Sequence, residues 1–146
     1  MNEITIADAT HEDGPAILAL LERSELPTAG LLEHLDNAIV ARRNATLVGA
    51  AALEMYGDSA LLRSVVVAPS ERGTRIGHRL TASALSRAKN QGVQTVYLLT
   101  TTAEHFFPKF GFEQIGRSDV PVGVQRSVEF SSACPASAIV MRKTLV

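Results

Sequence analysis

The sequence contains a single cysteine, Cys134, among its 146 residues. This excludes an internal disulfide and favours a reducing, cytoplasmic location. The chain also lacks an excess of charge of either sign, because 14 lysine and arginine residues stand against 15 aspartate and glutamate residues. We therefore expect neither a nucleic acid nor a membrane surface as a partner. The apolar runs are far shorter than the ~20 residues that span a bilayer.

The composition is that of an ordinary globular protein. Hydrophobic residues make up 46% and charged residues 20% of the chain, close to the usual proportions. The sequence shows neither an internal repeat nor a low-complexity stretch. A chain of this length buries roughly 68–70% of the surface that its unfolded form exposes, so its core can be stable without disulfides or a metal ion. We interpret residues 1–146 as one domain and expect no metal ion.

Hydrophobic periodicity predicts strands and helices in alternation. Strands are expected at 4–7, 38–41, 47–56, 61–67, 93–100, 112–115 and 138–141. Helices are expected after Thr10, at 31–35, at 76–90 and at 101–111, where Thr101 and Glu104 form the pattern of a capping box. The segment 120–135 is expected to be a loop with one helical turn. This order predicts a mixed α/β fold with a central hairpin meander and two later crossover helices.

One segment combines a strand, a basic turn containing glycine and the start of a helix. It covers residues 65–77 and reads VVVAPSERGTRIG. A helix N-terminus exposes free backbone N–H groups and the positive end of the helix dipole, so it suits a pyrophosphate. Gly73 and Gly77 allow the backbone to come close, and Arg72 and Arg75 add positive charge. On these residues alone, an ordinary strand–helix connection is an equal alternative.

This segment resembles the acetyl-CoA signature of the GNAT acetyltransferase superfamily. The signature is Val-x-Pro, then Arg/Gln-x-x-Gly-x-Gly/Ala, then a helix. Val67 and Pro69 match its first part, and Arg72 and Gly77 match the ends of its second part. Downstream, FFPKFGF at 106–112 resembles the family's Phe-Tyr-x-Lys-x-Gly-Phe. The two motifs follow the family's order. The predicted strands and helices also follow the family's element order over essentially the whole chain.

The resemblance implies a mostly antiparallel central sheet of about seven strands, with flanking helices and a splay between strands four and five. Acetyl-CoA is implied as the co-substrate bound in that splay. Its pantetheine arm would pair with the backbone of 65–67, and its pyrophosphate would lie on the turn 72–78. The cofactor-binding residues expected from the two motifs are Val65, Val66, Val67, Arg72, Gly73, Thr74, Arg75, Ile76, Gly77, His78, Thr101, Phe106, Phe107 and Lys109.

Two positions depart from the family pattern. Arg75 occupies the place of the central glycine, where the backbone approaches phosphate oxygens, and we expect its side chain to point outward. Phe107 stands where many relatives have a tyrosine that protonates the departing thiolate. We expect water to take that role, because a thiol with a pKa of roughly 8.5 already leaves well as its thiolate.

The acceptor site is predicted from two charged residues inside otherwise apolar strands. Glu54 and Arg63 are the expected catalytic residues. Gly57-Asp58 is a hairpin signal. With a hairpin loop at 57–60, the two charged side chains would share a face and could lie opposite each other. The acid could then orient or deprotonate an ammonium group, and the arginine could hold a carboxylate. A structural ion pair is an equal alternative. Thr100 and Arg126 complete the expected substrate-binding set, with a solvated arginine as the alternative for Arg126.

A closer resemblance suggests the kind of amine. The segments EMYG at 54–57, LLRS at 61–64, LLTTTAEHFF at 98–107 and FSSACPASA at 130–138 resemble N-acetyltransferases of arsenic-resistance operons. The Leu-Thr-Thr-Thr run and the ending 137–145 also resemble the acetyltransferase domain of N-acetylglutamate synthases. Both imply the α-amine of a small amino acid, and the arsenic relatives imply a glutamate analogue bearing arsenic or phosphorus.

Three further hypotheses accompany this one. The acceptor could be another amine, such as a polyamine or a protein N-terminus. The chain could be a catalytically silent acetyl-CoA sensor, a hypothesis that Phe107 motivates. A chance resemblance of an unrelated helix–sheet domain would require both motifs to be accidental. By analogy with small relatives that pair through late strands, a homodimer is expected.

Overall fold

The computed structural model describes residues 3–101, 103–130 and 137–145. Cys134, and with it most of the segment 130–138, lies outside these residues. No helix in the described ranges combines the length and the apolarity of a bilayer span.

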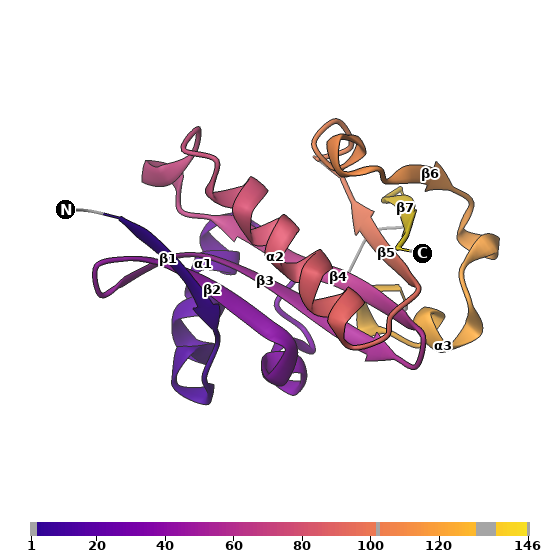
Figure 1. Cartoon of the computed structure of the whole chain (residues 1–146), viewed down its shortest axis with the longest axis horizontal. Coiled ribbons are helices and arrows are strands. Elements are labelled where there is room, and N and C mark those ends of the chain that lie inside the picture. The colour runs from indigo at the N-terminus through magenta and orange to yellow at the C-terminus, as the bar shows by residue number, and fades with distance from the viewer. Residues whose placement is uncertain (1–2, 102, 131–136, 146) are drawn as a thin grey trace.

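Within the described part of the chain, a seven-stranded sheet forms the centre of the molecule (Figure 1). The strands lie in the order β1-β2-β3-β4-β5-β7-β6. β4 and β5 are parallel, and the other neighbouring pairs are antiparallel. This confirms the predicted mixed, mostly antiparallel sheet. The strands are β1 (Ile4–Asp8), β2 (Ala38–Arg43), β3 (Thr46–Tyr56), β4 (Ser59–Val67), β5 (Thr95–Thr100), β6 (Glu113–Ile115) and β7 (Ile139–Thr144).

The helix α2 (Ile76–Asn90) has the predicted bounds and supplies the crossover that a parallel strand pair requires. It connects β4 to β5 and lies across β1 to β4 (Figure 1). Its buried positions follow helical spacing, which turns one apolar stripe toward the sheet. The helical elements are η1 (His11–Asp13), α1 (Gly14–Arg23), η2 (Leu31–Asn37), η3 (Pro69–Glu71), α2 (Ile76–Asn90), η4 (Phe107–Phe110), η5 (Arg117–Asp119) and α3 (Val122–Gln125), where η marks a 3-10 helix.

Different elements cover the two faces of β3. Gly49 faces α2, because a Cβ there would lie 2.9 Å from Cδ1 of Leu80. Glu54 is an odd number of positions further along the strand, so it points to the opposite face. There its carboxylate lies 3.7 Å from Nε2 of His34 in η2. The sheet therefore has an apolar face under α2 and a face toward η2 that carries buried charge.

The hairpin between β3 and β4 is tighter than predicted. Its loop is Gly57-Asp58 rather than 57–60, because Gly57 supplies the positive φ, 71°, that suits a two-residue turn. Glu54 is consequently paired with Leu61 and not directly opposite Arg63. The two charged residues are diagonal neighbours on one face, still within reach of long side chains.

One extra residue interrupts the pairing of β4 with β3. Arg63 is paired with Ala52, but Val66 is paired with Ala50, so Ser64 and the residue after it share one position opposite β3. Ser64 has a left-handed φ of 58°. Such a β-bulge bends its strand and re-aims the side chains around it.

The segment after β5 differs from the helix predicted at 101–111. Its helical part is the 3-10 turn η4, because Pro108 lacks the N–H group that an α-helix interior needs. The hydroxyl that accepts a backbone N–H here belongs to Thr100, from Ala103 at 2.9 Å, and not to Thr101. In the described ranges α2 is therefore the one long crossover helix, where two had been predicted.

Candidate functional site

A cleft of about 1020 Å³ opens where β4 and β5 separate. The two strands are paired at Ser59–Thr95, Ala60–Val96 and Leu61–Tyr97. β4 then continues to Val67 and β5 to Thr100 beyond the last of these pairs. The parts of β4 and β5 that are not paired with each other line the cleft. This is the splay between strands four and five that the family resemblance implied.

Most of the expected cofactor-binding residues come together around this cleft. Strand β4, the start of α2 and the segment after β5 each contribute to its wall. Arg72 and Lys109 bring positive charge to it, which suits an anionic ligand. The expected residues that line it are Val65, Val66, Val67, Arg72, Gly77, Thr101, Phe106, Phe107 and Lys109.

The turn before α2 has the backbone of a glycine-rich loop although one glycine is missing. Gly73 has a φ of 85°, in the left-handed region. Arg75 directly precedes α2 and is also left-handed, with φ 67° and ψ 15°. A side chain in this region strains the backbone, because its Cβ crowds the carbonyl that follows. Arg75, at the position of the motif's central glycine, thus has a backbone conformation that glycine adopts without strain.

The other expected residues of this turn do not line the cleft themselves. Ile76 is buried in the core between α2 and the sheet. His78 packs its ring against Phe110, with 4.7 Å between centroids. Thr74 donates its hydroxyl to the backbone carbonyl of Glu71, which closes the turn. The backbone of 73–76 therefore lies between two cleft residues, Arg72 and Gly77, and leads into the free N–H groups of the first turn of α2.

An ion pair holds the beginning of this turn to the sheet. Nε and Nη2 of Arg43 in β2 donate to the two carboxylate oxygens of Glu71 at 2.9 and 2.7 Å. The hydrogen bond from Arg43 lowers the pKa of the Glu71 carboxyl below its ordinary value. A two-point contact fixes orientation as well as distance, so Glu71 has a defined position just before Arg72.

An aromatic cluster forms the wall of the cleft after β5. Phe107 is 6% exposed. Its ring makes edge contacts with Phe106 at 5.1 Å and with Phe112 at 5.8 Å between centroids. The ring at this position therefore contributes packing to the wall, and it brings no proton donor.

Three buried charged residues gather at another part of the cleft. Nη1 of Arg63 lies 2.8 Å from Oε2 of Glu54, and Nε of Arg63 lies 3.3 Å from Oε2 of Glu129. Their exposed fractions are 2%, 0% and 4%. Arg63 and Glu129 line the cleft, and Glu54 lies behind Arg63. The ion pair that the sequence left open is present, and both predicted catalytic residues belong to it.

Glu54 is held in its ionised form. Burial raises the pKa of its carboxyl, but hydrogen bonds with Ser127, Tyr56 and Arg63 outweigh burial and bring that pKa below its ordinary value. In return, burial and the hydrogen bond to Glu54 raise the pKa of Tyr56 to about 12. The Tyr56 hydroxyl is therefore a donor to Glu54 at neutral pH.

The remaining expected substrate residues are separated. Thr100 lines the cleft with its hydroxyl engaged by the N–H of Ala103. Arg126 is exposed at the end of α3 and is not among the residues that line the cleft. Sequence reasoning missed Glu129, which is the residue of the late loop that lines the cleft, whereas Arg126 was the one expected. Its signal was faint: a buried arginine at 63 requires negative partners, but nothing local in the late loop marked position 129.

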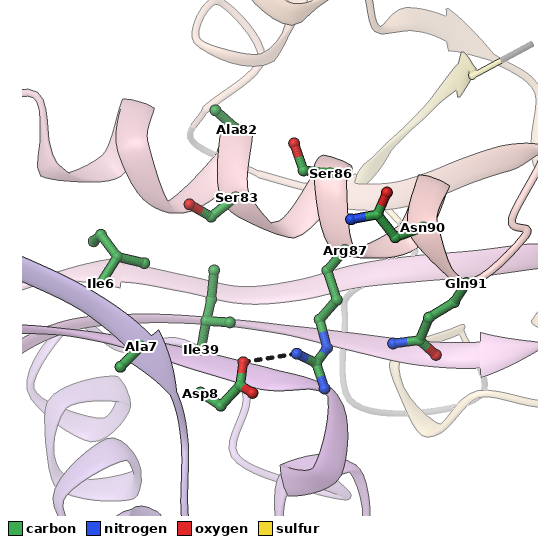
Figure 2. Close-up of a pocket in the computed structure, with 10 residues that line it drawn as sticks. All are labelled: Ile6, Ala7, Asp8, Ile39, Ala82, Ser83, Ser86, Arg87, Asn90 and Gln91. Atoms are coloured by element: carbon green, nitrogen blue, oxygen red, sulfur yellow. Dashed lines mark hydrogen bonds and ion pairs between the residues drawn. The ribbon is translucent and has the colours of Figure 1, made fainter.

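A second hollow, of about 570 Å³, lies between α2 and the edge of the sheet (Figure 2). Figure 2 shows Arg87 reaching from α2 to Asp8 at the end of β1, where Nη1 lies 2.7 Å from Oδ1. None of the predicted site residues lines this hollow. Across the described ranges, no three His, Cys, Asp or Glu side chains gather closely enough to hold a metal ion.

Curated relatives resemble most of this chain. It is 30% identical over 117 residues to an amino-acid acetyltransferase of Aeromonas salmonicida. The alignment covers 79% of this chain and 25% of that protein. It is 31% identical over 126 residues to an amino-acid acetyltransferase of Pasteurella multocida, with 80% and 29% covered. The chain thus spans between a quarter and a third of the length of these relatives.

Solved structures share the fold. Rv2747 from Mycobacterium tuberculosis, in complex with CoA and NLQ, superposes with a TM-score of 0.83 at 25% identity, over 97% of this chain and 99% of that one. N-acetylglutamate synthase from Neisseria gonorrhoeae, complexed with coenzyme A and N-acetyl-glutamate, superposes with a TM-score of 0.85 at 21% identity, over 100% of this chain and 36% of that one. The family model described as "Acetyltransferase (GNAT) domain" matches residues 34–114, more than half of the sequence. With this match, the two motifs and the splayed strand pair, the chain belongs to the GNAT acetyltransferase family.

Proposed function

We propose that the chain is an acetyl-CoA-dependent N-acetyltransferase that acts on the α-amine of a small, glutamate-like amino acid. The observation that carries this proposal is the separation of β4 from β5 beyond the Leu61–Tyr97 pair, with a basic helix start on one side and buried carboxylates on another. The names of the amino-acid acetyltransferases to which the chain is similar support the same acceptor class.

The residues of the cleft fit acetyl-CoA. The free half of β4 offers backbone donors and acceptors along Val65–Val67 to an extended pantetheine arm. The turn 72–77 offers free N–H groups and the side chain of Arg72 to a pyrophosphate. Lys109 adds a second positive charge in the same cleft. CoA is present in the related M. tuberculosis and N. gonorrhoeae structures, which supports this assignment.

The chain would accelerate transfer mainly by positioning and by hydrogen bonding. The backbone of β4 orients the thioester, and its N–H groups polarise the thioester carbonyl. The acceptor nitrogen must then be uncharged to attack. Phe107 supplies no proton to the departing sulfur, and the low pKa of a thiol, about 8.5, makes such a donor dispensable.

One observation favours a second acceptor class. Two carboxylates, those of Glu54 and Glu129, contact the Arg63 guanidinium beside the cleft. Carboxylates attract a cationic group by Coulomb interaction. A polyamine, with several ammonium groups, is therefore the alternative acceptor.

The test is release of CoA thiol from acetyl-CoA with a panel of amines. The panel contains glutamate, phosphinothricin, arsinothricin, spermidine and a peptide with a free N-terminus. Turnover of glutamate supports the proposal, and a preference for phosphinothricin or arsinothricin supports the finer hypothesis of a phosphorus or arsenic analogue. Turnover of spermidine alone moves the assignment to the polyamine. Tight acetyl-CoA binding without any turnover contradicts the enzymatic proposal and supports a sensor.

A further inference from the structure

Gly49 lies inside β3 at a point where both α2 and β4 come very close to it. A Cβ there would lie 2.9 Å from Cδ1 of Leu80 and 3.2 Å from Cγ2 of Ile76, both in α2. It would also lie 3.1 Å from the backbone carbonyl oxygen of Val66 in β4. A glycine inside a strand weakens that strand and often marks the close approach of another segment. Any side chain at this position would therefore displace one of its neighbours.

The two α2 residues above Gly49 have no room to turn away. Leu80 is 0% exposed and Ile76 is 1% exposed, and protein interiors have few voids that could take up a displaced side chain. Ile76 is also the first residue of α2. A methyl group on residue 49 would consequently push the first turn of the helix away from the sheet.

The first turn of α2 is at the same time a wall of the cleft. Gly77, which follows Ile76, lines the cleft together with Val67 at the end of β4. A Cβ on Gly77 would lie 3.6 Å from Cγ2 of Val67 and 3.7 Å from Cζ of Phe106, which are ordinary contact distances. The height of α2 above Gly49 therefore sets the separation between the turn 72–77 and the end of β4.

The third neighbour of Gly49 belongs to the other wall. Gly49 is paired with Val67, and the carbonyl of Val48 accepts the N–H of Ala68 at 2.8 Å. β3 thus holds β4 as far as its end. Pressure on the carbonyl of Val66 would shift the same segment, 65–67, that lines the cleft.

We propose that Gly49 is a positioning residue for acetyl-CoA, because its lack of a side chain sets the spacing between the turn 72–77 and the edge 65–67. This inference rests on the proposed binding of acetyl-CoA in the cleft. A ligand with its pyrophosphate on the turn and its pantetheine arm along the edge requires both at a fixed separation. Gly49 is not among the residues that line the cleft, so it acts through its neighbours.

The experiment compares the calorimetric Kd of CoA for wild type, Gly49→Ala and the control Gly14→Ala. Gly14 begins α1, and a Cβ there would likewise lie 2.9 Å from a leucine Cδ atom, that of Leu32. Neither of these two residues lines the cleft. We expect G49A to raise the Kd of CoA about 10-fold, because misplacing a binding group by less than 1 Å is costly. G14A is expected to leave this Kd unchanged.

The outcomes separate a positioning role from a merely structural one. Urea unfolding measures the stability of each variant. A lower urea midpoint for G49A with an unchanged Kd of CoA in the folded protein overturns the proposal, and so does an equal rise of Kd in G14A. The Kd of ADP, which has a pyrophosphate but no pantetheine arm, is expected to be the same in G49A and wild type. An equal rise for ADP and CoA overturns the role in spacing, because it indicates a damaged turn.

A second variant covers the case in which G49A does not fold. Gly49→Ala is then combined with Leu80→Val, because valine lacks the Cδ1 atom that the new methyl group would meet. The double variant is compared with L80V alone. A Kd of CoA that is higher in the double variant supports the proposal, since the carbonyl of Val66 is still crowded. Equal Kd values overturn it.

This measurement needs no acceptor, so its failure is distinguishable from failure of the proposed function. If the amine panel releases no CoA thiol while CoA still binds, the enzymatic proposal fails and the comparison of G49A with wild type still decides the role of Gly49. If wild type does not bind CoA, the role of Gly49 is overturned together with the cofactor site.

Discussion

Arg63 and Glu54 form an ion pair of 2.8 Å that is almost fully shielded from solvent, with exposed fractions of 2% and 0%. Each charge depends on the other, because an unpaired charge in this environment is costly. The pair connects β3 to β4 next to the hairpin that ends in Gly57-Asp58. It therefore links the stability of the hairpin to the geometry of the cleft.

We predict that Arg63→Ala lowers the free energy of unfolding by about 3–5 kcal/mol, because it leaves buried carboxylates without their counter-charge. Glu54→Ala is expected to cost a similar amount. The double variant, Glu54→Ala with Arg63→Ala, should cost less than the sum of the two. Urea unfolding followed by circular dichroism measures all three. Strict additivity would show that the pair contributes nothing as a pair.

The stability of the protein is predicted to fall at acidic pH. The folded pKa of Glu54 lies below the ordinary value of 4.5, so its ionised form is favoured in the native state. This contribution is fully present above the unfolded pKa and disappears as pH falls through the folded pKa. The urea midpoint should therefore decline from about pH 5 downward. Glu54→Gln should be less stable at pH 7 but decline less steeply, and parallel curves would contradict this origin.

Tyr56 is predicted to ionise late. Its pKa is raised from 10.0 to about 12, so the phenol stays protonated while an ordinary tyrosine ionises. The raised value means that its stabilising contribution is present below pH 10 and is lost as pH rises toward 12. Absorbance at the phenolate band measures the titration. Tyr56→Phe should remove the late step, and a late step that persists in this variant would assign it elsewhere.

The left-handed backbone at Arg75 yields a prediction with opposite signs at two positions. Arg75→Gly should raise the free energy of unfolding by about 1 kcal/mol, because glycine adopts a φ of 67° without strain. Gly73→Ala, at a φ of 85°, should lower it by a similar amount. Thermal unfolding of both variants is the measurement. A loss of stability in R75G would show that contacts of the arginine side chain outweigh its backbone strain.

Arg72 is predicted to act on the phosphates of acetyl-CoA. Arg72→Ala should raise the KM for acetyl-CoA about 10- to 100-fold, the equivalent of losing one charge-assisted hydrogen bond. The KM for acetyl-pantetheine, which lacks the pyrophosphate, should stay unchanged. Arg87→Ala, in the hollow of Figure 2, is the matched control and should alter neither value. An equal rise for both thioesters in R72A would contradict a phosphate contact.

The order of the elements and the bounds of α2 could be predicted from the sequence, because they depend on local periodicity and on Gly92 after the helix. The cleft could be predicted because the two motifs lie on its walls. The exact register of β3 with β4 could not, since one glycine decided between a long and a two-residue loop. The helix from 101 was wrong because the capping pattern at Thr101 outweighed Pro108 in the prediction.

Glu129 shows a different kind of limit. Its importance comes from a contact with Arg63, which lies far from it in the sequence. The local sequence pattern of the late loop cannot predict such a contact, because the contact depends on how the chain returns to the cleft after α3. Arg126, in contrast, has the charge that the prediction sought but is exposed at the end of that helix.

The extra residue at Ser64 divides β4 into two halves with different surroundings. The half before it carries Arg63 and lies beside Glu54 and Glu129, whereas the half after it carries Val65–Val67 along the cleft. The bulge shifts the alternation of side chains by one residue. The side chains that face the cleft before Ser64 are therefore set independently of those after it. In the proposed function the first half would meet the acceptor and the second half would hold the thioester, so the two contacts can be changed separately. One fold could in this way acquire new amine specificities without relinquishing its co-substrate.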